Sequence, residues 1–253
     1  MKMIWNNLKQ NIILAFGGTI VAALVLCVIE IYMAKTTAVA YNIELWIDAC
    51  NILDFFFPLL VTLPFCWRIY FERKDKYIEY VCVREEKKKY IFKKILSGMI
   101  SSFSMVYVSY FVGLVVAVYV VNPEVVMEND ILQRYLFGTM QAEQPLLFGI
   151  FWCVWKAFIG ALICGFGYVV ALVVDNLFVI ALLPFIYCTL ENFVTATLRL
   201  EKYSFCTSYI LNRLSPDSMK ISNCGIGVVS FLVVGSVIIL GLFYRKKQVE
   251  VNG

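Results

Sequence analysis

The stretch that decides the fold is RIYFERKDKYIEYVCVREEKKKYIFKK, residues 68–94, a charged island between two long apolar runs. It holds ten of the 22 Lys and Arg residues in the chain. Lys and Arg residues near the ends of membrane-spanning helices are retained on the cytoplasmic side. The island therefore predicts a cytoplasmic loop, and it sets the direction of the apolar runs on either side.

The composition is typical of an integral membrane protein. Hydrophobic residues make up 61% of the chain and charged residues 16%. Lipid offers no hydrogen-bonding partners to the backbone, and the alternating pattern of a membrane barrel is missing, so the predicted fold class is all-α. We expect one transmembrane domain over residues 1–253, with a cytoplasmic loop over 71–96. The six predicted spans are 11–32, 51–70, 97–121, 146–174, 177–198 and 225–244.

The distribution of basic residues predicts the topology. Fifteen Lys and Arg residues fall on the side of the island and the two termini, and six fall on the opposite side. This bias predicts a multi-pass protein of the cell membrane with both termini in the cytoplasm. The net charge of +4 then reflects topology and does not call for a nucleic-acid partner.

The N-terminus has a second interpretation, a cleaved signal peptide. Lys2 and Lys9 precede an apolar run, and residues 38–40 match an A-x-A cleavage site. Two observations oppose a signal peptide. The apolar run is longer than the usual apolar core of a signal peptide, and Glu30 and Lys35 lie between this run and the A-x-A match.

Missing residue types exclude several enzyme classes. The chain contains no histidine, so it cannot form an H-E-x-x-H zinc site or ligate haem through His. It also lacks a G-x-x-x-x-G-K-[ST] loop, so any ATP would be bound by another chain. We expect no catalytic residue, no metal site and no cofactor in this chain. Nine cysteines show no metal spacing, and whether Cys206 and Cys224 form a disulfide stays open.

Ionisable residues inside spans point to substrate or ion pathways, so their depth matters. Counting along each span places Glu30 and Asp54 toward the outer surface, and no chain of acids and bases is predicted at the midplane. Lys156 is expected to snorkel at the outer interface beside Trp152 and Trp155. Glu191 is the deepest acidic candidate. Glu191 and Lys156 are the candidate residues of a substrate path or outer vestibule, and a local structural role also remains open for Glu191.

The island contains a short apolar cluster formed by Tyr77, Ile78, Tyr80 and Val81. Charged residues bracket this cluster, which predicts a small helix suited to a groove on a partner protein. The basic run over 87–94 then approaches the next span, where Lys side chains meet anionic lipid headgroups. The alternative is that the whole loop lies on the membrane surface without a partner.

With this loop in view, nearly the whole chain resembles the permease subunits of type-2 ATP-binding-cassette exporters. In that family the loop after the second span begins with an acidic residue, continues through a coupling helix, and ends with Tyr and Lys. Glu72, the cluster 76–81, Tyr90 and Lys94 match this layout. The sequence departs from the family where Asp75, Lys76 and the continuous Cys82–Val83–Arg84 replace the usual Gly and Pro-containing turn. The expected ATPase interface is Trp5, Glu72, Asp75, Lys76, Tyr77, Ile78, Glu79, Tyr80 and Val81.

Two further segments fit the resemblance. Ile4, Leu8 and Ile12 recur every four residues beside Trp5, which predicts an interfacial amphipathic helix, with simple continuation of the first span as the alternative. Residues 192–222 are too apolar for a free loop, and the resemblance implies short outer helices before the sixth span. Small residues of the fourth span offer a close-packing surface, and a dimer interface there stays open; they are Gly160, Cys164, Gly165 and Gly167.

The resemblance implies the membrane-spanning subunit of an ATP-driven exporter. Its partners would be separate ATPase subunits that bind ATP and Mg²⁺, an identical or paralogous permease, and membrane lipids. Its substrate would be an amphipathic peptide, an antibiotic or a lipid-like molecule. Two other classes remain open: a secondary carrier or channel that needs no ATPase, and a membrane-anchored immunity or interaction protein.

Overall fold

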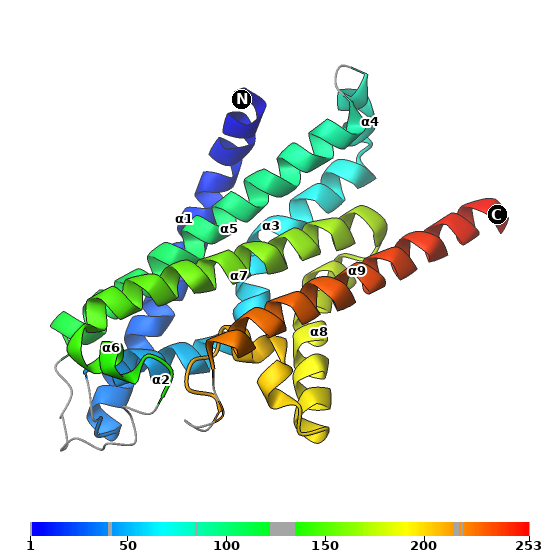
Figure 1. The fold of residues 1–253 in the computed structure, drawn as a ribbon. Helices are drawn as coiled ribbons and strands as arrows, with labels where there is room; N and C mark the ends of the chain where they lie inside the picture. Colours follow the sequence, from blue (N-terminus) through cyan, green and yellow to red (C-terminus); the bar gives the residue numbers. More distant parts are fainter. Residues whose placement is uncertain are drawn as a thin grey trace.

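A computed structural model of the protein describes residues 2–39, 42–83, 86–121, 135–214, 218 and 220–252. Within these ranges the regular elements are helices, which confirms the all-α prediction (Figure 1). The elements in chain order are α1 (Lys2–Thr36), α2 (Asn42–Asp54), α3 (Phe57–Lys74), α4 (Tyr77–Cys82), α5 (Lys87–Tyr119), α6 (Gly138–Glu143), α7 (Pro145–Val173), α8 (Leu177–Thr197), the 3-10 helices η2 (Glu201–Tyr203) and η3 (Phe205–Ser208), and α9 (Ile221–Asn252).

Five of the described helices are long and apolar enough to cross a membrane, and α2 with α3 makes a sixth if the two are one broken span. These two helices meet at an angle of 54°. The second span was predicted as residues 51–70, so the helical segment starting at Asn42 and the bend were missed. Pro58 explains the break, because it has no backbone N–H to donate to the carbonyl group of Asp54 four residues earlier, whereas it suits the first turn of a new helix.

The first helix differs from the prediction at its N-terminus. α1 runs unbroken from Lys2 to Thr36, which favours the alternative, a continuation of the first span, over a separate interfacial helix. No proline interrupts this segment. At 35 residues, α1 is about 52 Å long, which exceeds the roughly 30 Å of bilayer hydrocarbon. Part of α1 therefore extends beyond the membrane core.

The centre of the bundle is formed by α5 and α7, which pack against each other, while α1 covers α5 and α3 covers α7 (Figure 1). Small residues permit this close approach. A Cβ added at Gly160 would lie 3.1 Å from Val106 of α5, and one at Gly167 would lie 2.7 Å from Cys66 of α3. The small-residue surface predicted for the fourth span is thus covered by helices of the same chain.

The two ends of the bundle carry different elements. The N-terminus, α4, the α7–α8 turn and the C-terminus lie toward one end, while α6, η2 and η3 lie toward the other (Figure 1). The predicted spans 146–174 and 177–198 leave only Asp175–Asn176 between them, and the structure has a tight turn there, in which the Asn176 side chain accepts hydrogen bonds from the backbone N–H of Phe178 and Val179. Asn176 thereby caps α8.

A glycine pair on α9 tests how this helix packs. A methyl group at buried Gly227 would overlap Ser208 Oγ and lie 2.7 Å from the carbonyl oxygen of Ser204, whereas one at exposed Gly225 would meet nothing within 4 Å. We expect Gly227→Ala to lower the free energy of unfolding by about 1–3 kcal/mol. Gly225→Ala, the matched control, should raise it by up to about 1 kcal/mol. Thermal unfolding of both variants in detergent measures the difference, and equal midpoints would show that α9 does not pack on η3 in this way.

Candidate functional site

A short helix stands at one end of the bundle, between α3 and α5. α4 begins at Tyr77 because Lys76 adopts a left-handed backbone conformation (φ 56°), which separates α4 from the end of α3. The predicted boundaries, 76–81, therefore shift by one residue to Tyr77–Cys82. At six residues, α4 is far too short to span a membrane.

The predicted apolar cluster on α4 is divided between the inside and the outside of the molecule. Ile78 is 4% exposed and belongs to the hydrophobic core, and Val81 packs against that core. Tyr77 and Tyr80 are 51% and 69% exposed and face outward. The outward aromatic surface of α4 therefore consists of these two tyrosines, with the exposed residues Asp75, Lys76 and Glu79 beside them.

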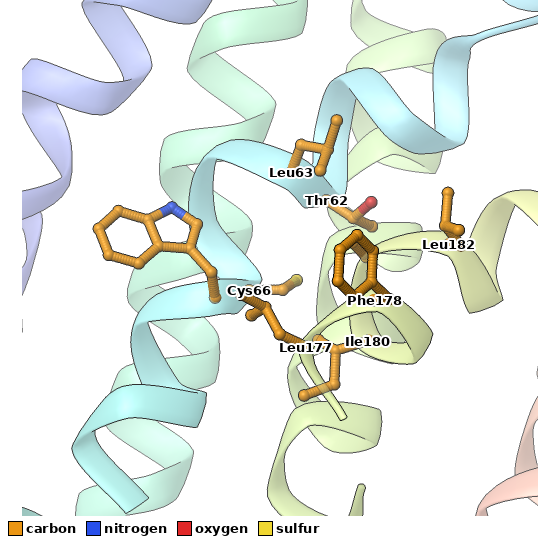
Figure 2. A pocket seen from close by; sticks show the side chains of 9 residues that line it. Thr62, Leu63, Cys66, Leu177, Phe178, Ile180 and Leu182 are labelled. Atoms are coloured by element: carbon orange, nitrogen blue, oxygen red, sulfur yellow. The ribbon is translucent and has the colours of Figure 1, made fainter. Parts of the chain in front are cut away.

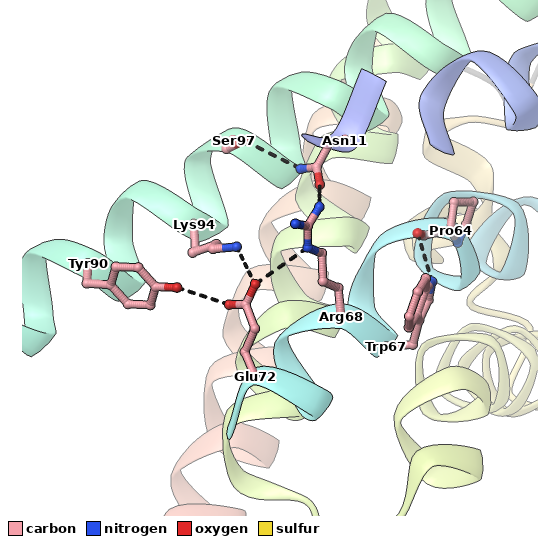
Figure 3. Close-up of polar contacts among 8 residues, drawn as sticks. All are labelled: Asn11, Pro64, Trp67, Arg68, Glu72, Tyr90, Lys94 and Ser97. Carbon is pink, nitrogen blue, oxygen red and sulfur yellow. Dashed lines mark hydrogen bonds and ion pairs between the residues drawn. The ribbon is translucent and has the colours of Figure 1, made fainter. Parts of the chain in front are cut away.

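Directly beneath α4, the Glu72 carboxylate forms a hub between α3 and α5 (Figure 3). It accepts from Lys94 Nζ at 2.5 Å and from the Tyr90 hydroxyl at 3.1 Å, and Arg68 Nε lies 3.5 Å away. The side chains of Lys94 and Glu72 are only 7% and 14% exposed. The three residues predicted from the loop layout, Glu72, Tyr90 and Lys94, are thus brought together. Glu72 itself faces into the chain, although it was predicted on the partner surface.

The hub continues to α1 and the α7–α8 turn. Arg68 Nη1 donates to Asn11 Oδ1 at 3.3 Å, and Asn11 Nδ2 donates to Ser97 Oγ at 3.4 Å (Figure 3). Nearby, Arg73 Nη2 donates to the carbonyl oxygen of Val174 and to Asp175 Oδ1. Polar contacts therefore tie the end of α3 that carries α4 to α1, α5 and the α7–α8 turn. Trp5 lies on α1, but its side chain falls outside the described part of the chain.

A second polar cluster lies deeper in the bundle, where α2, α5 and α7 meet. Lys156 Nζ lies 2.6 Å from Asp54 Oδ2, and both side chains have no exposed surface. The Tyr110 hydroxyl donates to Asp54 Oδ1 at 2.7 Å, and Lys156 Nζ lies 4.6 Å from the centre of the Tyr110 ring. Sixteen residues of α5, about 24 Å, separate Tyr110 from Lys94 of the hub.

The position of Lys156 corrects the prediction that this residue snorkels to the interface. It points into the bundle, and Trp152 beside it is also buried, at 2% exposed. An aromatic belt and a buried aromatic face have the same spacing along a helix, so the sequence pattern did not distinguish them. The missed signal was charge: Asp54 and Lys156 are opposite charges within apolar segments, which is typical of paired groups.

Glu191, the other predicted pathway residue, has local partners. Its Oε2 accepts from Ser204 Oγ at 2.9 Å, and its Oε1 accepts from the backbone N–H of Phe205 at 3.0 Å. These bonds hold the start of η3 against α8, as the local structural interpretation requires.

The segment before the sixth span contains η2 and η3, where short helices were expected. Cys206 on η3 and Cys224 on α9 are both free thiols, so this pair forms no disulfide. Cys206 is 4% exposed, and burial raises the pKa of its thiol. A buried thiol of this kind is unreactive.

An apolar cavity of about 490 Å³ opens between α3 and α8 (Figure 2). Thr62 is a polar residue on its wall, and its hydroxyl is bonded to the carbonyl oxygen of Pro58. The remaining lining residues are apolar or aromatic side chains, Leu63, Cys66, Trp67, Leu177, Phe178, Ile180, Ala181 and Leu182. Its chemistry suits an apolar ligand or a hydrocarbon chain.

The fold and the site together define a class. The chain is an all-helical protein with five or six helices able to cross a membrane and a short helix held at one end by buried charges. Among the described residues, no group of three His, Cys, Asp or Glu side chains is placed to hold a metal ion. Comparisons with known protein families, curated proteins and solved structures find no match.

Proposed function

We propose that this chain is the membrane-spanning permease subunit of a type-2 ATP-binding-cassette exporter in the cell membrane. The observation that carries the proposal is the outward pair Tyr77 and Tyr80, which stands on the buried charge hub of Glu72 and Lys94. Exposed tyrosines on a short helix suit a groove on a partner. In this proposal the partner is a separate ATPase, which binds ATP and Mg²⁺, and α4 is the coupling helix.

The polar contacts around Glu72 connect α4 mechanically to the membrane-spanning helices. A partner that pulls on α4 would move the end of α3, to which the left-handed Lys76 joins it directly. The Glu72–Lys94 bond would carry that displacement to α5, and the Arg73–Asp175 bond would carry it to the α7–α8 turn. Such rigid-body shifts between packed helices underlie transitions between inward and outward arrangements.

The substrate would be an amphipathic peptide, an antibiotic or a lipid-like molecule, and the apolar cavity between α3 and α8 suits the apolar part of any of these. A second permease, identical or paralogous, would complete the assembly.

The test of the proposed function is co-expression with the ATPase encoded beside this gene, followed by purification through a tag on one partner. Recovery of a complex that hydrolyses ATP supports the proposal. Transport that persists after ATP depletion, without any bound ATPase, contradicts it.

A second candidate function is an ATP-independent carrier, and one observation favours it. The fully buried Asp54–Lys156 pair with Tyr110 is the kind of intramembrane ionisable group that marks ion and proton pathways. A membrane-anchored interaction protein would use the α4 surface without ATP turnover. ATP-dependent transport separates the exporter from both alternatives.

The proposed orientation makes a separate prediction. Val83 beside α4 is 85% exposed and Tyr203 at the other end of the bundle is 41% exposed, whereas the nine native cysteines are buried or half-buried. With α4 and both termini in the cytoplasm, an impermeant maleimide applied to intact cells should label Tyr203→Cys and leave Val83→Cys unlabelled. Both should react after permeabilisation. Labelling of Val83→Cys alone in intact cells would reverse the orientation, and the parent protein gives the background from native thiols.

A further inference from the structure

Glu30 on α1 differs from the other buried carboxylates described above. Its side chain has no exposed surface, and neither carboxylate oxygen has a hydrogen-bond partner among the described residues. By contrast, Asp54, Glu72 and Glu191 each accept bonds from named donors. A buried polar atom without a partner lowers stability, and it does so more strongly if it is charged. Within the part of the chain that the structure describes, Glu30 therefore has no group that compensates its burial.

Among the described residues, the neighbours of Glu30 pack closely on its carboxyl group, and none of them forms an ion pair with it. Gly113 of α5 faces it, and a Cβ at this position would lie 2.9 Å from Glu30 Oε1. Cys27 on α1 and Cys50 on α2 lie within electrostatic range of Glu30. Both are thiols, which do not neutralise a carboxylate. The carboxyl group of Glu30 thus lies in a closely packed region where α1 meets α2 and α5.

Lys156, a described base in the same region of the interior, is already engaged. Cys50 is within electrostatic range of Asp54, Cys153 and Lys156 as well as Glu30, so these groups share one region of the interior. Lys156 forms its ion pair with Asp54. Tyr110 of α5 also bonds Asp54, and α3 meets α1 through Arg68 and Asn11, far along α1 from Glu30. An ionised Glu30 would therefore add an uncompensated negative charge to this region.

We propose that Glu30 is a proton-binding site, occupied when α1, α2 and α5 pack as they do in this structure. An uncompensated ion inside a protein costs several kcal/mol, whereas a protonated carboxyl group is neutral. If α1 moves away from α5 and water reaches the carboxyl group, the proton is released to that water. The packing of α1 is then linked to proton concentration. This inference does not depend on the proposed ATPase partner.

Infrared spectroscopy of the protein in lipid nanodiscs tests the site directly, through the carbonyl band of a protonated carboxyl group. We expect this band in the wild type near neutral pH, its loss in Glu30→Gln, and its retention in Glu191→Gln, the matched control with bonded oxygens. Persistence of the band in Glu30→Gln, or its absence from the wild type, overturns the proposal. Gly113→Ala keeps the acid but crowds it, so the band should shift in frequency. An unshifted band would place the proton elsewhere.

Stability gives a second readout with a definite sign. If the native state holds a proton that the unfolded chain releases, stability falls as pH rises, by up to about tenfold in the folding equilibrium per pH unit. Unfolding of the wild type between about pH 5 and about pH 9 should show this loss, and Glu30→Gln should show a weaker pH dependence. An equal pH dependence in both proteins overturns the proposal.

Discussion

Lys156→Met is expected to lower the free energy of unfolding by about 3–5 kcal/mol, because it leaves Asp54 charged, buried and without its partner. Both side chains have no exposed surface and lie 2.6 Å apart. The pair joins α7 to the bend between α2 and α3, so its loss should loosen the centre of the bundle. Unfolding of the purified protein in nanodiscs measures the change.

The double variant Asp54→Asn with Lys156→Met separates the ion pair from packing. Removing both charges eliminates the uncompensated ion, and the amide oxygen introduced by Asp54→Asn would still accept from the Tyr110 hydroxyl. We therefore expect the double variant to be more stable than Lys156→Met alone. Lys202→Met, at an exposed position over the Tyr203 ring, is the control and should change stability by less than about 0.5 kcal/mol. Equal losses in the single and double variants would show that Asp54 is not ionised in this structure.

Tyr80→Asp is expected to weaken association with the proposed ATPase by about 2 kcal/mol or more, about thirtyfold in dissociation constant. Tyr80 is the more exposed of the two tyrosines on α4, and the substitution would place an unpaired charge in an apolar groove of the partner. Pull-down with a tagged chain and ATP turnover of the recovered complex measure the effect.

The matched control is Tyr203→Asp, the same substitution on an exposed tyrosine at the opposite end of the bundle. It should leave ATPase binding unchanged. Ile78→Asp would not test the docking surface, because Ile78 is buried within the chain and a charge at this position would disturb the fold. Unchanged binding in Tyr80→Asp, with normal expression, would show that α4 is not the docking surface.

The sequence predicted the long helices well because apolar runs of sufficient length have few alternatives in a membrane. The turn at Asp175–Asn176 follows from the spacing of the predicted spans, whereas the loop residues Glu72, Tyr90 and Lys94 were singled out by the resemblance to the exporter family. α2 was missed, since its mixed polar and apolar residues resemble a surface segment as much as a helix. The continuity of α1 had been only the alternative, because an amphipathic N-terminal pattern fits an interfacial helix and the start of a longer helix equally well.

The interior of the site could not be predicted from spacing along the chain. Counting residues gives the depth of a side chain within a helix, but not the neighbouring helix that it faces. Asp54 and Lys156 are 102 residues apart in sequence and meet only because the end of α2 packs against α7. Likewise, Gly113, which faces the Glu30 carboxyl group, lies on a different helix, α5. The pairing of these side chains therefore required the tertiary structure.

The central claim is that α4 couples this chain to a separate ATPase, and the most direct test is binding of the ATPase encoded beside its gene to the wild-type chain in nanodiscs. The account predicts a saturable complex whose ATP turnover depends on an intact α4 surface. Absence of binding at any ATPase concentration tested, together with substrate transport that continues without ATP, would contradict it.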